Sequence, residues 1–325
     1  MASRIITLLL MVALILALAA CRPDGNNDPG GAPSAPGDPG AQNTPGDPEA
    51  SVPPSPLPGV NAANYPRIDG STANLPLIAA LYSKFCGVSR DEAETLVSIS
   101  GGTGAVWRNM MYEGADLLLV YEAPENIKEE MKEAGLFDKL EITPLGRDGL
   151  VFLVNANNPV DNLSREQLVG IYSGAITDWS VVGGEEGPIA AFQRNQESGS
   201  QTLFIGLLMK DIAPMEPPSE LRPASMGGLI DAIAAYDGSG GAIGFSVFYY
   251  ANLMYENPSL KILSVDGITP SAESIGNKKY PLVNDFYAVI RKSEPADSPA
   301  RLLRDWLLTE EGRQLMLEEN YVPAD

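Results

Sequence analysis

The segment 194-RNQESGSQT-202 combines the residue types that bind small oxyanions. Arg194 lies four to six residues before Ser198, Gly199 and Ser200, at what the pattern predicts to be the start of a helix. Arginine offers a rigid fork of donors that suits phosphate or sulfate. Serine and glycine at a helix start add hydroxyls and unpaired backbone N–H groups with partial positive charge. The segment therefore predicts a site for a tetrahedral oxyanion.

Two further segments, 69-DGST-72 and 101-GGTG-104, also place small hydroxyl residues and glycine directly before a predicted helix. Taken singly, such residues are most often ordinary helix N-caps. In combination with Arg194 they become candidates for the same oxyanion site. Ser71, Thr72 and Thr103 are the candidate donors.

Charge and composition exclude several functional classes. The 325 residues carry a formal net charge of −20 and contain no histidine. The negative charge opposes binding to nucleic acid or to an anionic bilayer surface. Without histidine, the usual general base, the usual zinc ligand and Ser-His or Cys-His nucleophile pairs are absent. We therefore expect no enzyme activity, no metal site and no cofactor, and any bound anion must be held by local dipoles and hydrogen bonds.

The N-terminal region has the pattern of an export signal followed by a tether. Residues 5–20 are apolar or small and end in 18-LAAC-21, a run too short for a typical membrane span. The small residues before Cys21 resemble a bacterial lipobox, which implies a signal peptide over residues 1–20 and a lipid anchor, such as palmitate, on Cys21. A plain secretory signal is the alternative. The Pro/Gly-rich composition that follows, to residue 60, predicts a disordered tether.

The remaining residues alternate between helix and strand patterns, which is typical of open α/β sheets. Ligands of such sheets bind beyond the carboxyl ends of strands, near helix N-termini. Trp107, Trp179 and Cys86 are predicted to be buried packing residues. The predicted helices cover residues 73–87, 105–114, 124–135, 164–174, the segment after 200, 227–236 and 299–319; the predicted strands cover 116–121, 139–146, 149–155, the segment near 189, 242–248 and 284–290.

Several segments together resemble the phosphate-binding lipoproteins of bacterial ABC phosphate importers. They are 69-DGSTANLPL-77, 157-NNPVDNLSREQLVGIYSGAITDWSVVGG-184, the cluster from Arg194 to Ser200, 241-GAIGF-245 and 265-VDGITPSAESIGNKKYPL-282. The resemblance implies a type II periplasmic-binding-protein fold, in which two α/β lobes joined by two crossover strands close over one dehydrated phosphate. It places lobe I at residues 61–149 and 283–325, and lobe II at residues 150–282.

The resemblance also implies roles for individual residues. Arg194 matches the arginine that clamps phosphate, and Ser198 with Gly199 matches the Ser-Gly pair of the family. Ser200 stands where many members have threonine. Thr72, with Ser71 beside it, matches the helix start of the first lobe, and Thr103 or Gly102 falls at a second serine-containing loop.

One position departs from the family pattern. Members commonly carry a Ser-Asp pair after the strand that corresponds to residues 116–121, and the aspartate accepts the proton of hydrogen phosphate. This sequence has Tyr121 and Glu122 there. Glu122 could accept that proton from one methylene further away, which would discriminate against fully ionised sulfate. The alternative is a solvated glutamate between strand and helix.

The expected function is therefore an extracytoplasmic, lipid-anchored and monomeric receptor that delivers inorganic phosphate to the membrane permease of an ABC importer. Two alternatives stay open at this point. One is a surface lipoprotein of the same fold with a sensing or interaction role. The other is a receptor for a different oxyanion or a phosphorylated small molecule.

Replacing Cys21 tests the anchor. Cys21→Ser removes the only thiol that the lipobox offers for acylation, so the protein should be released from the membrane fraction or stay uncleaved. Mass spectrometry of the mature N-terminus checks the result. An unmodified N-terminus elsewhere in the wild-type protein would contradict the prediction.

Overall fold

The computed structural model describes residues 57–236 and 241–324. The expected signal peptide, Cys21 and most of the expected tether lie outside these residues. The packed region begins earlier than residue 61, because Val60 is fully buried and Leu57 packs against the same core. The last four residues of the expected tether thus belong to the folded part.

The strands follow the alternating pattern that the sequence predicts. Leu117–Val120 is buried along its whole length, as expected for a strand covered on both faces. In chain order the strands are β1 (Ile68–Gly70), β2 (Leu117–Val120), β3 (Leu140–Asn155), β4 (Asn162–Leu163), β5 (Ala190–Ala191), β6 (Ala242–Val247), β7 (Leu260–Ile262), β8 (Ser264–Val265), β9 (Val283–Arg291) and β10 (Val322–Pro323).

Helix boundaries follow local capping signals. For example, Ser164 and Gln167 form a capping box at the start of α5, and Gly174 ends that helix in the left-handed conformation. The α-helices are α1 (Leu75–Cys86), α2 (Arg90–Leu96), α3 (Thr103–Met111), α4 (Glu125–Glu133), α5 (Arg165–Ser173), α6 (Gly199–Leu203), α7 (Met226–Ala234), α8 (Ala272–Gly276), α9 (Pro299–Leu307) and α10 (Glu310–Glu318). Short 3-10 or π segments are η1 (Thr72–Asn74), η2 (Phe137–Lys139), η3 (Trp179–Val182), η4 (Phe204–Met209), η5 (Ser219–Leu221) and η6 (Tyr250–Met254).

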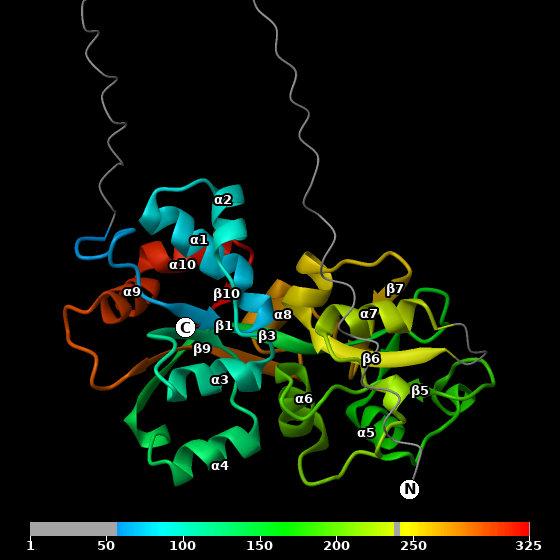
Figure 1. The fold of residues 1–325 in the computed structure, drawn as a ribbon. Coiled ribbons are helices and arrows are strands. Elements are labelled where there is room, and N and C mark those ends of the chain that lie inside the picture. The colour runs from blue at the N-terminus through cyan, green and yellow to red at the C-terminus, as the bar shows by residue number, and fades with distance from the viewer. Residues whose placement is uncertain (1–56, 237–240, 325) are drawn as a thin grey trace, which may run out of the picture. The chain divides into compact units, whose positions relative to one another are not determined.

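Two groups of strands share the long strand β3 (Figure 1). The strand order is β1-β2-β9-β3-β6-β5, with β1 parallel to β2 and β5 parallel to β6. We call the half around β1 and β2, with α1 to α4, lobe I, and the half around β5 and β6, with α5 to α7, lobe II. The lobe boundaries that we expected at residues 149/150 and 282/283 remain a prediction.

The chain passes between the lobes through paired segments of β3 and β9. The first part of β3 pairs with β9, up to Gly149 opposite Val283, and the second part pairs with β6 and β7. The sequence predicted two strands, 139–146 and 149–155, where the structure has one strand with an irregularity between Pro144 and Gly146. The charged residues Arg147 and Asp148 interrupt the apolar pattern, but both pair with β9, so the strand continues through them.

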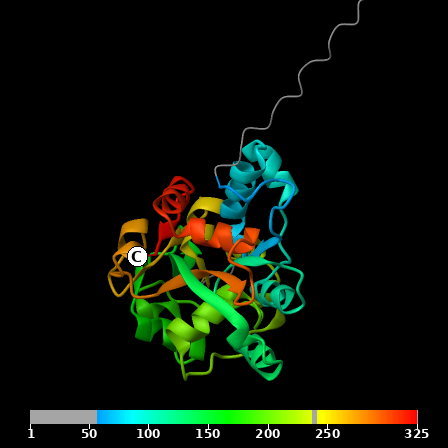
Figure 2. The same ribbon diagram turned by 90° about the vertical axis from the view of Figure 1, so that its left-hand side faces the viewer.

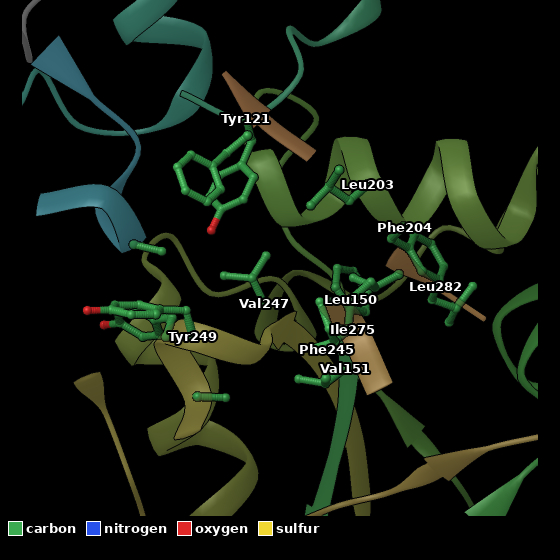
Figure 3. Close-up of a cluster of buried hydrophobic side chains, with 14 of the residues drawn as sticks. Tyr121, Leu150, Val151, Leu203, Phe204, Phe245, Val247, Tyr249, Ile275 and Leu282 are labelled. Carbon is green, nitrogen blue, oxygen red and sulfur yellow. The ribbon is translucent and has the colours of Figure 1, made fainter. Parts of the chain in front are cut away.

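Aromatic and aliphatic side chains from both crossover regions form a continuous buried cluster (Figure 3). Within lobe II, Phe204 stacks on Phe245 with ring centroids 4.4 Å apart, and Tyr172 packs against both rings. Trp107 and Trp179 are also buried, as is Cys86, which confirms the three predicted packing residues.

The C-terminal region is two helices, so the prediction of one helix over 299–319 is wrong. The break falls at Leu308 and Thr309, and the Thr309 hydroxyl caps α10 by accepting from the N–H of Gly312. A side chain at Gly312 would come within 2.4 Å of the Trp306 carbonyl oxygen, so glycine permits the tight corner. Both helices lie on the same side as α1 (Figure 2), where Trp306 packs edge-on against Phe85.

None of the helices among the described residues has the length and apolar character needed to cross a membrane.

A buried carboxylate lies where the two crossover strands pair. Asp148 is enclosed, and it accepts hydrogen bonds from the Tyr121 hydroxyl at 2.7 Å and from the N–H groups of Gly149 and Tyr249. Burial raises the pKa of Asp148 to about 6, although these three donors favour its ionised form. The protonated carboxyl is therefore favoured by folding, and ionisation weakens the folded state.

Asp148 should make the free energy of unfolding decrease as the pH rises. A raised folded-state pKa contributes stability below the unfolded value near 4 and loses it as pH rises through about 6. The free energy of unfolding of the wild type, relative to Asp148→Asn, should fall by about 2–3 kcal/mol between pH 4 and pH 7. Urea denaturation of both proteins across this range measures the difference, and parallel pH profiles would contradict it.

Candidate functional site

A cavity of about 640 Å³ lies between the two lobes, and it brings together most of the predicted site residues. Its lining includes Ser71, Thr72 and Thr103 from lobe I and Arg194, Ser198, Gly199 and Ser200 from lobe II. These residues are up to 129 positions apart in the sequence, from Ser71 to Ser200. Seven of the eight predicted ligand-binding residues thus line one space.

Arg194 is held rigidly at the cavity wall. Its side chain is only 7% exposed; Nε donates to the Pro223 carbonyl at 3.1 Å and Nη2 to the Ala224 carbonyl at 2.9 Å. Its Nη1 is buried and has no hydrogen-bond partner. Burial lowers the pKa of Arg194 to about 10, which leaves the guanidinium charged at neutral pH. Such a buried, incompletely paired cation is costly without an anionic partner.

The hydroxyl groups of lobe I come from the starts of η1 and α3. The Ser71 Oγ lies 3.2 Å from the Thr103 Oγ1, and it also accepts a hydrogen bond from the N–H of Tyr121. Ser71 follows β1 and Tyr121 follows β2, and these strands are parallel neighbours. Their carboxyl ends therefore meet at the cavity, as expected for ligand sites of open α/β sheets.

The donors of lobe II come from the loop between β5 and α6 and from the first turn of α6. The Ser198 Oγ and the Ser200 Oγ lie 3.1 Å apart, and both residues are buried. Gly199 packs directly on lobe I, because a side chain there would come within 2.4 Å of the Thr103 Oγ1. The Arg194 N–H donates to the Gln201 side chain, which links the two ends of this loop. Glycine at 199 thus lets the donors of the two lobes share one space.

The cavity also has lining residues that we did not assign to the site from the sequence. The start of α7 contributes Ser225 and Gly227, and Asp231, Tyr250 and Tyr255 line the same space. The stretch 225-SMGG-228 has a hydroxyl-and-glycine pattern at the start of a helix, like the other segments, so the sequence contained a signal for this part of the cavity. Tyr250 has no comparable local signal, because only the path of the chain through lobe II brings it to the cavity.

Glu122 does not line this cavity but a neighbouring one of about 580 Å³, which Arg194 also lines. Its side chain is half exposed and pairs with the Lys128 Nζ at 2.6 Å. It follows Tyr121 directly, and because Tyr121 points its hydroxyl toward Asp148, the next side chain leaves in another direction. Among the cavity's lining residues the carboxylate is instead that of Asp231, which accepts from the Tyr255 hydroxyl.

No group of three or more His, Cys, Asp or Glu side chains that could hold a metal ion occurs within 57–236 and 241–324. The chemistry of the cavity is that of hydrogen-bond donors around one guanidinium.

This arrangement of two lobes around a donor-lined cavity is matched by a known family model. The model described as the PBP superfamily domain matches residues 58–311. The chain belongs to the PBP superfamily. The fold that the sequence predicted, two α/β lobes of type II joined by crossover strands, is thereby confirmed.

Relatives of known function and solved structures agree with this assignment. The phosphate-binding protein PstS of Bacillus subtilis is 24% identical over 323 residues, covering 99% of this chain and 94% of the relative. The PstS of Borreliella burgdorferi is 23% identical and covers 78% of this chain and 88% of the relative. These relatives are named binding proteins, not enzymes.

Two solved structures share the fold. An ABC-type phosphate transport receptor from Vibrio cholerae is 26% identical, with a TM-score of 0.57, and the match covers 81% of this chain and 99% of that chain. A Clostridium perfringens protein solved with bound phosphate is 24% identical, with a TM-score of 0.61, over 82% of this chain and 99% of that chain.

Proposed function

We propose that this PBP superfamily protein captures inorganic phosphate between its lobes and delivers it to the membrane permease of an ABC importer. The observation that carries the proposal is the buried Nη1 of Arg194, a charged donor without a partner, at a cavity lined with hydroxyls. A phosphate oxygen would complete its hydrogen bonding. The names of the PstS relatives support phosphate as the anion.

The same proposal includes the location and the anchoring of the protein. A lipid on Cys21 and a tether of Pro/Gly-rich sequence would keep the receptor outside the cytoplasm, close to its permease. We propose that it acts as a monomer and has no catalytic role, because capture and delivery need neither a second copy nor a nucleophile.

A sensing or interaction lipoprotein with a degraded site is the second class that the sequence left open. The residues that line the cavity do not indicate a degraded binding site. The arginine and the hydroxyls of Ser71, Thr103 and Ser198 all line one cavity, and the departure at Glu122 lies outside it. A receptor that binds its ligand is therefore the function that the geometry favours.

Truncation of Arg194 tests the proposal directly. Arg194→Ala should weaken phosphate binding by about 3–5 kcal/mol, because a dehydrated anion would lose its buried cation. Arg194→Lys should recover only part of the affinity, since a single ammonium cannot replace the fixed fork. Calorimetry with phosphate, sulfate, arsenate and phosphonates measures the binding, and near-wild-type affinity of the alanine variant would rule out this site.

A pair of variants separates the two carboxylates near the site. Glu122→Gln should leave both phosphate and sulfate affinities within about twofold of wild type, because Glu122 pairs with Lys128 outside the cavity. Asp231→Asn makes the same change of charge inside the cavity, and it should raise sulfate binding relative to phosphate by about three- to tenfold. Calorimetry with both anions gives the ratios.

The outcome assigns selectivity to one of the two residues. A shift in the sulfate-to-phosphate ratio caused by Glu122→Gln alone would contradict the placement of its side chain and restore the role implied by the family resemblance.

A further inference from the structure

A bidentate ion pair joins the segment from Arg194 to Ser200 of lobe II, which we call the oxyanion loop, to helix α3 of lobe I. Arg108 donates from Nη1 to the Glu197 Oε2 at 2.7 Å and from Nη2 to the Glu197 Oε1 at 2.8 Å. The side-chain amide of Asn126 donates to the same Oε1 at 3.0 Å. Three donors from two helices of lobe I thus hold one carboxylate of lobe II.

The backbone of Glu197 is bound by the same helix. The N–H of Gly104, in the first turn of α3, donates to the Glu197 carbonyl at 3.0 Å. In the chain, Glu197 directly precedes Ser198, and Gly104 directly follows Thr103. The residue that α3 holds is therefore the immediate neighbour of the hydroxyl donors that line the cavity from both lobes.

Arg108 is also bound within its own lobe. Its Nε donates to the Glu130 Oε2 on α4 at 3.0 Å, so the guanidinium is shared between an intralobe and an interlobe carboxylate. The hydrogen bonds from Arg108 outweigh partial burial and lower the pKa of Glu197, which keeps this carboxylate ionised at neutral pH. Both side chains are about one third exposed, so salt should screen part of the attraction.

We propose that Glu197 and Arg108 are positioning residues that hold the oxyanion loop against α3 and favour the closed arrangement of the lobes. Separation of the lobes at this edge must break the ion pair, the Asn126 bond and the Gly104 bond together. A variant without the pair populates the binding-competent arrangement less, and its apparent affinity falls in proportion. The effect on phosphate rests on the proposed function, whereas the effect on lobe opening does not.

A matched ion pair within lobe I provides the control. Arg67 donates to the two oxygens of Asp116 at 2.9 Å and 2.5 Å, which is also a bidentate pair. These residues flank the parallel strands β1 and β2, so movement between the lobes leaves the pair intact. Asp116→Asn thus removes the same kind of interaction without touching the lobe contact.

The experiment is a double-mutant cycle on the whole mature protein. Glu197→Gln should weaken phosphate binding about five- to tenfold at low salt, mainly through faster dissociation. The loss should shrink in 1 M NaCl, where the wild-type pair is screened. Arg108→Gln should have a similar effect, and the double variant should be no weaker than the weaker single variant. Asp116→Asn should change affinity by less than twofold.

A ligand-free measurement keeps the inference separate from the proposed function. Small-angle scattering without phosphate should give Glu197→Gln a larger radius of gyration than the wild type and Asp116→Asn. If the wild type binds no phosphate, the proposed function fails, and the scattering result still decides the role of the pair. An unchanged radius of gyration, together with additive effects of the Glu197 and Arg108 substitutions on affinity, would overturn the proposed role of the ion pair. Arg108→Lys, which keeps the charge and loses the fork, serves as the second variant if Glu197→Gln does not fold, and partial loss is expected.

Discussion

The buried guanidinium of Arg194 is the constraint on which the site depends. Two of its donors are fixed by the carbonyls of Pro223 and Ala224, which leaves Nη1 unpaired at the cavity wall. The loop before α7 therefore sets the position of the charge before any ligand arrives. A preorganised donor of this kind binds an anion without the cost of rearranging the side chain. In a chain with a net charge of −20, such local donors must overcome an unfavourable overall field.

The crossover region connects this site to the rest of the fold. Tyr121 lines the cavity, and its hydroxyl donates to Asp148, which lies where β3 pairs with β9. The cavity wall and the paired crossover strands thus share one buried hydrogen bond. At a second contact between the lobes, Arg108 and Glu197 join α3 to the oxyanion loop. Movement between the lobes is constrained both by the covalent crossovers and by this ion pair.

Local sequence patterns were sufficient to predict candidate donors where the hydroxyl and glycine residues lie together at one helix start. The hydroxyl and glycine residues before η1, α3 and α6 were identified from sequence, because capping and dipole effects act within one helical turn. The single C-terminal helix was predicted wrongly, since the corner is so tight that a side chain at position 312 would collide with the Trp306 carbonyl oxygen, a constraint that the apolar pattern does not reveal. Glu122 was placed at the site by family resemblance, and its side-chain direction could not be read from its position after a strand.

The sequence by itself determined the α/β class, the negative charge that opposes binding to nucleic acid, and Arg194 with its neighbouring hydroxyls as the candidate residues of an oxyanion site. These depend on composition and on short-range periodicity. Only the tertiary structure decided that Asp231 and Tyr250 line the cavity while Glu122 does not, and that Arg108 reaches Glu197 across the lobes. These contacts join residues 89 positions apart in the case of the ion pair. They arise from the packing of two lobes, a property that no local window of sequence contains.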